Sequence, residues 1–488
     1  MGSAGRLIAA LVVLTACTSP PREQTNPEVR QDLSPSAVIG TLTTSQPLVS
    51  TASASTPAPA IERTRYTIQG VFEYPAKQLG IVQEVTFLND TGQSLNTLEL
   101  VVDANRFPGA FILDSVTHPD GRPISGWSLE GIKLRIPLAN SLDPGAQWAF
   151  VLDFTLRIPA GAGVLGFNDR QANLGNWLPS VPPYRSGQGW LIYPANPVGE
   201  HLSYDLADYY LTLQVLNYPT GLTVISNVSL DVHEGLIDLE ATARNLSLTF
   251  SPELIPFSGG SEEVGVFVYT FAGGEAGGFA AVPVVTQALA LFSGLFGAYP
   301  HESFSLVAAD FPDGMEFDGL AFLNQGYFES FDGTPQNYLT LLAVHETAHQ
   351  WWPGLVGSDQ AIEPWLDEAL ATYCELIFLE HFYPNLTEWW WDFRVDAYEP
   401  FTGFEGHVDD MIYQHSRFRP YVNAVYLNGV RFLEAVRAAI GDEAFFQALS
   451  DYTQKFKGRE ATSSDLLELF SRTEPNALTQ ILETFFER

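Results

Sequence analysis

The sequence predicts a multidomain α+β protein, in which an N-terminal antiparallel β-saddle or sandwich precedes a mainly helical domain. Three observations support this fold class. Short runs of β-branched and apolar residues, separated by Gly and Pro, fill the region 62–257, as expected for antiparallel strands. From residue 337 onward the apolar residues recur at helical spacing. The 488 residues, of which 46% are hydrophobic and 13% aromatic, suffice for two or three domains with large cores.

Residues 1–17 have the features of a targeting segment that is not part of the fold. Arg6 provides a positive charge before the apolar run Leu7–Leu14, which is too short to cross a bilayer as a mature helix. The run leads into Leu-Thr-Ala-Cys, which ends at Cys17 and resembles the bacterial lipobox. We therefore expect a lipoprotein signal peptide, a lipid anchor at Cys17 and an extracytoplasmic location at the cell membrane.

Residues 18–61 are rich in Ser, Thr and Pro and contain few large apolar groups. Such a segment buries too little surface to fold, so we expect a disordered tether. The only cysteine besides Cys17 is Cys374. If Cys17 carries lipid, Cys374 has no intramolecular partner, and we expect no disulfide and a core position for Cys374.

Individual strands stand out in the β-rich domain expected at 62–257. The run Ile81–Leu88 ends at the turn signal Asn-Asp-Thr-Gly. Three further runs have the same β character: Leu98–Val102, Trp148–Phe154 and Tyr209–Val215. The Ser-Gly-Gly-Ser stretch that starts at residue 258 marks the expected domain boundary.

The second domain, expected at 258–488, combines a few strands with many helices. The residue patterns predict two strands, Val264–Phe271 and Ser303–Ala309. They also predict two long helices outside the motif described below, Val282–Phe296 and Val425–Ile440.

The charge balance excludes some partners. The chain has 57 acidic and 24 basic side chains, a formal net charge of -33. Nucleic acid requires a basic surface, so we expect no nucleic-acid partner. Electrostatic docking to an anionic membrane is excluded for the same reason. The negative charge is typical of a surface kept soluble by self-repulsion.

The most informative motif is His-Glu-Thr-Ala-His at residues 345–349. Positions i and i+4 of a helix share a face, so both imidazoles can bind one metal ion, with Glu346 as a general base. A catalytic zinc needs a third protein ligand and an open position. Glu368, on a second predicted helix, has the expected spacing, and Asp367 and Glu363 are rival carboxylates. The leading hypothesis is a site for one Zn²⁺ ion made by two histidines and Glu368.

Two further groups are candidates for the chemistry. Tyr426 could donate a hydrogen bond to a developing oxyanion, although 19 tyrosines compete for that role. Residues 313–317 read Asp-Gly-Met-Glu-Phe and follow a predicted strand. A carboxylate there could receive the free amino group of a substrate; on the residue pattern alone, a surface turn is the competing interpretation.

These motifs together resemble the gluzincin aminopeptidases, the family of membrane alanyl aminopeptidase and leukotriene hydrolase. The family's Gly-x-Met-Glu-Asn motif is matched by Gly314-Met315-Glu316, and its Tyr-x-Lys-Gly motif by Tyr426 and Gly429. The resemblance implies a thermolysin-like catalytic domain and one Zn²⁺ per chain. It covers residues 264–488 well and the β-rich region more loosely.

The resemblance also implies a role for each matched residue. Zinc would be bound by His345, His349 and Glu368. Glu346 would be the general base, and Tyr426 would stabilise the oxyanion. Substrate would be bound by Gly314, Met315 and Glu316, with Glu316 recognising the α-amino group.

The chain departs from the family pattern at three positions: Phe317, Asn428 and Ala369 replace Asn, Lys and Gly. The expected function is removal of N-terminal residues from peptides by metal-activated water. Two alternatives stay open at this stage. One is an endopeptidase or oligopeptidase with the same zinc site, and the other is a non-catalytic cell-surface binding protein with a structural zinc.

Overall fold

The computed structural model describes residues 36–38, 62–398 and 406–487. The predicted signal peptide and Cys17 lie outside the described residues. So does most of the predicted tether, with one exception. Ser36–Val38 forms strand β1 and pairs antiparallel with β14 (Thr223–Ser226), so at these residues the expectation of disorder was wrong. The described residues all belong to one compact unit.

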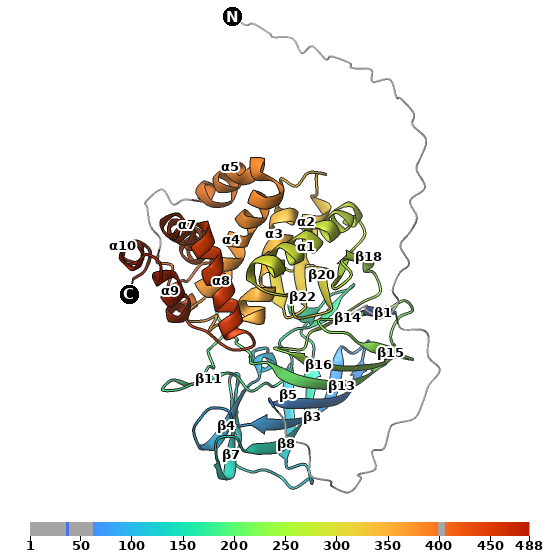
Figure 1. Ribbon diagram of the computed structural model, residues 1–488. Helices are drawn as coiled ribbons and strands as arrows, with labels where there is room; N and C mark the ends of the chain where they lie inside the picture. Colours follow the sequence, from blue (N-terminus) through green and yellow to red (C-terminus); the bar gives the residue numbers. More distant parts are fainter. Residues whose placement is uncertain (1–35, 39–61, 399–405, 488) are drawn as a thin grey trace, which may run out of the picture. The chain divides into compact units, whose positions relative to one another are not determined.

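The N-terminal region is built from β-sheets, as predicted (Figure 1). A seven-stranded sheet has the order β15 (Asp231–His233), β16 (Leu236–Ala243), β13 (Ala207–Leu216), β2 (Arg65–Glu73), β3 (Gln78–Leu88), β8 (Gln147–Arg157), β5 (Phe111–Thr117). A three-stranded sheet has the order β4 (Leu95–Val101), β7 (Lys133–Leu142), β6 (Ser128–Glu130). A five-stranded sheet has the order β1, β14, β17 (Leu248–Ser251), β10 (Ala172–Leu174), β9 (Leu165–Phe167). β11 (Tyr184–Arg185) and β12 (Gly189–Trp190) form a hairpin.

Alternation of side chains explains these sheets. In β13 every second side chain is buried, the pattern of a strand with one face on a core. Three of the predicted runs lie wholly in strands β3, β8 and β13, and the run Leu98–Val102 lies in β4 except for Val102, which follows the strand. One detail differs from the antiparallel expectation, because β2 and β13 pair in parallel. These two strands come from distant parts of the chain, so no hairpin constrains their direction.

The second region has its own sheet, with the order β18 (Ile255–Gly260), β19 (Gly265–Thr270), β20 (Ser303–Ala309), β22 (Leu320–Asn324), β21 (Gly314–Phe317). The boundary expected between residues 257 and 258 falls inside β18. The Gly-Gly pair does not end the strand there, because Gly259 and Gly260 continue the antiparallel ladder with β19. The predicted strands Val264–Phe271 and Ser303–Ala309 correspond to β19 and β20.

Helices account for most of the chain after β22. They are α1 (Glu275–Phe296), α2 (Gln325–Glu329), α3 (Tyr338–Ala348), α4 (Trp365–Phe382), α5 (Thr387–Trp390), α6 (Phe418–Tyr421), α7 (Asn428–Ile440), α8 (Asp442–Phe456), α9 (Ser463–Ser471) and α10 (Pro475–Phe485). The helix predicted at Val425–Ile440 is α7 together with the end of a wider π-helical turn, Val422–Leu427. Short 3-10 or π turns lie at Asp103–Arg106, Gln350–Leu355, Pro384–Leu386, Trp391–Val395, Asp396–Tyr398 and Ile412–Gln414.

Among the described residues, α1 is the one helix long and apolar enough to cross a membrane by length and composition. Its side chains instead belong to a protein core. Phe292 and Phe296 are fully buried, and both pack against the ring of Trp351. The helix therefore covers the sheet of the second region.

Two hydrophobic cores support the two regions. One is formed by the strands of the N-terminal sheets. The other joins the second sheet to α1, α3, α4 and α7. It includes Cys374, which is buried, as predicted. In Figure 1, α3 and α4 lie side by side within the second region. These two helices carry the metal motif.

Candidate metal centre and active site

The three predicted metal ligands meet between α3 and α4. α3 begins at the cap residue Asn337, whose side chain accepts a hydrogen bond from the Thr340 amide. The candidate donor atoms of His345, His349 and Glu368 all lie within 4.8 Å of one another. Glu368 Oε2 is 3.3 Å from His345 Nε2 and 3.7 Å from His349 Nε2. One turn of α3 and the first turn of α4 therefore present three convergent ligands.

The chemistry of this cluster fits a zinc ion. The three side chains are at most 5% exposed. Within the described residues Glu368 Oε2 has no hydrogen-bond partner, and a buried carboxylate oxygen without a partner is costly. Two imidazoles and one carboxylate form the ligand set of a catalytic zinc.

His349 is oriented by a neighbouring carboxylate. Its Nδ1 lies 2.6 Å from Asp367 Oδ1 and 2.9 Å from the Trp352 carbonyl. Asp367 also accepts a hydrogen bond from Gln360 at 2.6 Å. A carboxylate on Nδ1 leaves Nε2 free to bind the metal. Asp367, a rival ligand in the sequence, therefore lies behind His349 and positions it.

His345 has a similar partner, which the sequence analysis missed. Glu375 Oε1 lies 3.3 Å from His345 Nδ1. Glu375 is fully buried and accepts hydrogen bonds from Arg394 and from the Trp390 indole. Burial, the largest single influence, raises the pKa of the Glu375 carboxyl, but Arg394 and His345 together outweigh it and the pKa is lowered. Glu375 lies two turns after Glu368 on the same face of α4, and this helical spacing was the signal in the sequence.

The candidate base Glu346 lies beside the edge strand β21. A Cβ atom on Gly314 would collide with Glu346 Oε1, so any larger residue here would displace the Glu346 carboxylate. Burial raises the pKa of Glu346 to about 7. Its Oε2 has no hydrogen-bond partner among the described residues. A buried carboxylate with a pKa near neutrality suits a general base.

The site contains a second carboxylate besides Glu316, that of Glu200. Glu316 accepts a hydrogen bond from Gln360 at 3.2 Å. Glu200, from the segment between β12 and β13, lines the same cavities as Glu316. Burial raises the pKa of Glu200 to about 8, and it also raises the pKa of Glu316. No described Lys or Arg pairs with either group, so an ammonium group would stabilise both as carboxylates.

Two tyrosines complete the site. The ring of Tyr426 lies parallel to the His345 imidazole at 6.2 Å, and burial, together with the nearby Glu368 carboxylate, raises the pKa of its hydroxyl. The predicted residue therefore lies at the metal centre. Tyr421 packs edge-on against Tyr426. Its hydroxyl is buried without a hydrogen-bond partner in the described part of the chain, and the sequence analysis did not single it out.

The departures from the family motifs leave the metal cluster intact. Phe317 is buried and packs against the Phe322 ring. Ala369 replaces a glycine on α4, and Gly429 of α7 lies opposite, where a Cβ would collide with the Ala369 methyl. The Ala369 methyl group on α4 therefore occupies the space between the two helices, and the lack of a side chain at Gly429 on α7 leaves room for it.

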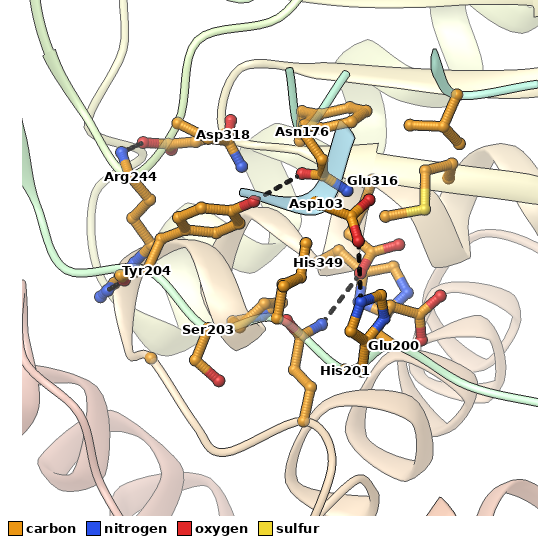
Figure 2. A pocket seen from close by; sticks show the side chains of 18 of the residues that line it. Asp103, Asn176, Glu200, His201, Ser203, Tyr204, Arg244, Glu316, Asp318 and His349 are labelled. Carbon is orange, nitrogen blue, oxygen red and sulfur yellow. Dashed lines mark hydrogen bonds and ion pairs between the residues drawn. The ribbon is translucent and has the colours of Figure 1, made fainter. Parts of the chain in front are cut away.

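One cleft of about 390 Å³ is lined by the three metal ligands, the base Glu346, Tyr426 and the two carboxylates Glu200 and Glu316. A smaller cavity of about 190 Å³ shares Glu200, Glu316 and His349 with the cleft and extends away from it. Figure 2 shows this cavity, with Glu200, Glu316 and His349 close together, Asp103 bonded to His201, and Tyr204 bonded to Asn176. Met315 also lines it. Gly314, Met315 and Glu316 therefore all lie at the site where substrate binding was predicted.

Comparison with known proteins identifies the family. Residues 281–486 match the "Peptidase family M1 domain". Aminopeptidase M1-D of Oryza sativa subsp. japonica is 24% identical over 302 residues, which cover 58% of this chain and 34% of that protein. Aminopeptidase N of Lactobacillus delbrueckii subsp. lactis is 29% identical over 203 residues, which cover 38% of this chain and 24% of that protein. The matched part thus spans about a third or less of the length of these relatives.

Solved structures show the same fold. An M1 zinc metallopeptidase from Deinococcus radiodurans superposes with a TM-score of 0.63 at 18% identity, over 88% of this chain and 95% of that one. A mutant of that protein bound to a Tyr-Ser-Ala substrate gives a TM-score of 0.60 at 18% identity, over the same shares of the two chains. The two-part architecture predicted from the sequence is confirmed. Residues 281–486 are therefore a peptidase family M1 domain, which agrees with the resemblance to the gluzincin aminopeptidases.

Proposed function

We propose that this protein is a zinc-dependent aminopeptidase that removes the first residue of peptides. The observation that carries the proposal is the closeness of the base, the metal ligands and two further carboxylates. Side-chain ligand atoms of Glu316, Glu346 and His349 lie within 4.8 Å of one another, and Glu200 lines the same cleft. A free α-amino group at Glu200 and Glu316 brings the first peptide bond, and no later one, to the base.

Each residue has a defined task in this reaction. When bound, zinc supplies a Lewis acid for the scissile carbonyl and lowers the pKa of the attacking water. Glu346 accepts the proton of that water and delivers it to the leaving amine. The Tyr426 hydroxyl donates to the oxyanion of the tetrahedral intermediate. Asp367 and Glu375 hold the two histidines in the orientation that zinc binding needs.

The first side chain of the substrate has a place in this arrangement. The α-carbon carries the amine, the carbonyl and the side chain. With the amine at Glu316 and the carbonyl beside Glu346, the cavity of about 190 Å³ is the space open to the side chain. This volume exceeds the roughly 150 Å³ cavity that holds a benzene ring, so large first residues fit.

The decisive experiment is hydrolysis of one short peptide, first with a free and then with an acetylated N-terminus. We expect the wild type to remove the first residue of the free form alone. Glu346→Gln loses the activity, because the base is gone. Glu316→Gln and Glu200→Gln raise KM for the free form, because each removes one partner of the amine. Equal cleavage of both forms would overturn the aminopeptidase assignment and leave an endopeptidase or oligopeptidase. If neither form is cleaved, a binding protein with structural zinc becomes the better account.

We also propose that the protein is exported and attached to the outer face of the cell membrane through a lipid on Cys17. The support is the sequence pattern of residues 1–17. Mass spectrometry of the mature N-terminus should find a lipidated cysteine. Cys17→Ala should move the protein from the membrane fraction to the soluble fraction. An unmodified N-terminus on membrane-bound protein would contradict the proposal.

A further inference from the structure

The lining of the cleft carries charges of both signs. Glu200, Glu316, Asp313, Glu346 and the metal ligands line it together with two arginines, Arg394 and Arg419, the only arginines among its lining residues. In a chain with 57 acidic and 24 basic side chains, two arginines in one cleft are unexpected.

The two arginines differ in whether they already have an ion-pair partner among the described residues. Arg394 donates to both oxygens of the Glu375 carboxylate, at 3.0 Å and 3.3 Å, and is 8% exposed. Its charge is thus neutralised. Arg419 is exposed, and among the described residues it forms no ion pair. Among the described residues that line the cleft, Arg419 is therefore the cation without an ion-pair partner.

Arg419 is held in place by aromatic contacts. Its guanidinium carbon lies 4.2 Å from the centre of the Tyr398 ring. The Tyr398 hydroxyl is 2.7 Å from the Tyr338 hydroxyl, and the Asn423 side chain donates to the Tyr398 carbonyl. Stacking leaves the edge of a guanidinium free for a carboxylate and reduces the entropy lost on binding.

The position of Tyr338 allows a rough estimate of the distance from the metal ligands to Arg419. Tyr338 is the first residue of α3 and His345 follows two turns later, roughly 11 Å along the helix axis. An extended peptide advances about 3.3–3.6 Å per residue. A C-terminal carboxylate about three residues beyond the scissile carbonyl would therefore lie near Arg419. Because the Arg419 side chain is flexible, the carboxylate of a peptide one residue shorter can also reach it.

We propose that Arg419 binds the free C-terminal carboxylate of short peptides, so that this cleft selects tri- and tetrapeptides. The inference rests on the proposed aminopeptidase function and adds a substrate class to it. The cleft then holds both ends of a zwitterionic peptide, with the amine at Glu316 and the carboxylate at Arg419. In longer peptides the C-terminal carboxylate lies beyond Arg419, so this contact does not contribute to their binding.

The test compares Leu-Gly-Gly-Gly as a free acid and as a C-terminal amide. We expect wild-type kcat/KM to be about tenfold higher for the acid, because a charge-assisted contact at a partly exposed site is lost in the amide. Arg419→Met retains the apolar stem and should remove the acid preference while leaving cleavage of the amide within about twofold. Arg417→Met is the matched control. Arg417 is exposed, two residues away, and does not line the cleft, so this variant should keep the preference.

Three further substrates distinguish a C-terminal carboxylate from a side-chain carboxylate as the group that binds Arg419. An octapeptide acid and its amide should be cleaved equally. Leu-Gly-Gly-Glu amide carries its carboxylate on a side chain and should be cleaved like the tetrapeptide amide. If it matches the tetrapeptide acid, an acidic side chain is the ligand and the length selection is rejected.

A binding measurement keeps the inference independent of turnover. In zinc-loaded Glu346→Gln, calorimetry should show tighter binding of the tetrapeptide acid than of its amide, and Arg419→Met should abolish the difference. Absence of hydrolysis by wild type would reject the proposed function, while the acid-to-amide binding ratio still decides about Arg419. Equal binding of both forms, or an equal loss in Arg417→Met, overturns the inference.

Discussion

Replacing Arg394 with methionine tests the network behind His345. The change removes three hydrogen bonds to Glu375, which is fully buried. Breaking a buried ion pair from one side leaves an uncompensated charge and costs roughly 3–5 kcal/mol. The Trp390 indole still donates to Glu375, so the lower end of that range applies. Because the freed carboxylate no longer has a fixed position behind His345, zinc affinity should also fall about 10–100-fold.

Arg431→Met is the matched control for this variant. Arg431 pairs with Asp396 at 2.8 Å, but the two side chains are 27% and 49% exposed. Exposed pairs contribute about 0.2–1 kcal/mol. The loss of Tm, measured by calorimetry on the zinc-loaded protein, should therefore be at least about threefold larger for Arg394→Met. Zinc affinity, measured by competition with a chelator, should be unchanged in the control. Equal losses of Tm in the two variants would refute the assignment of a buried, structurally required pair.

Three further predictions follow from the site and its surroundings. Gly314→Ala should lower kcat by about 100-fold or more with zinc content intact, since the new methyl displaces Glu346. Gly294→Ala, where a Cβ meets nothing within 4 Å, should match wild type, and equal kcat in both variants would contradict the reasoning. Asp367→Asn should weaken zinc binding about 10–100-fold, and an unchanged zinc Kd would show that this carboxylate does not orient its histidine. Burial raises the pKa of Glu460 to about 7, so the folded state binds more protons than the unfolded state from about pH 4.5 to 7 and loses stability as pH rises through that window. Glu460→Gln should accordingly raise Tm at pH 8 and bring little gain at pH 4, and a gain independent of pH would contradict the assignment.

The metal centre could be predicted because its determinants are local. His345, Glu346 and His349 share one turn of helix, and Glu368 begins the next helix after a short connection. Local spacing therefore fixes which side chains converge. The strands were predictable for the same reason, because alternation along each run marks its buried face.

Residues that depend on tertiary contacts were not predictable. Glu200 lies in a segment with neither helical nor strand periodicity, and its partner Glu316 comes more than a hundred residues later. Pairing across such a distance leaves no mark in a single sequence. The end of the β-rich region was misplaced because Gly259 and Gly260 are typical of a turn, whereas the ladder with β19 overrides that local preference.

The origin of Glu200 has a consequence for how selectivity can change in this fold. The metal ligands and the base belong to helices of one hydrophobic core, whereas Glu200 comes from a connection of the β-rich region. Insertions or substitutions in the Asn196–His201 connection can therefore alter which end of a peptide is accepted while the hydrolytic machinery stays as it is. Local opening of that connection would remove Glu200 from the cleft transiently. During that time the site would have lost one of the two carboxylates proposed to bind the substrate's amino group. Recognition of the substrate's amino group would thus be shared between this connection, which carries Glu200, and strand β21, which carries Glu316.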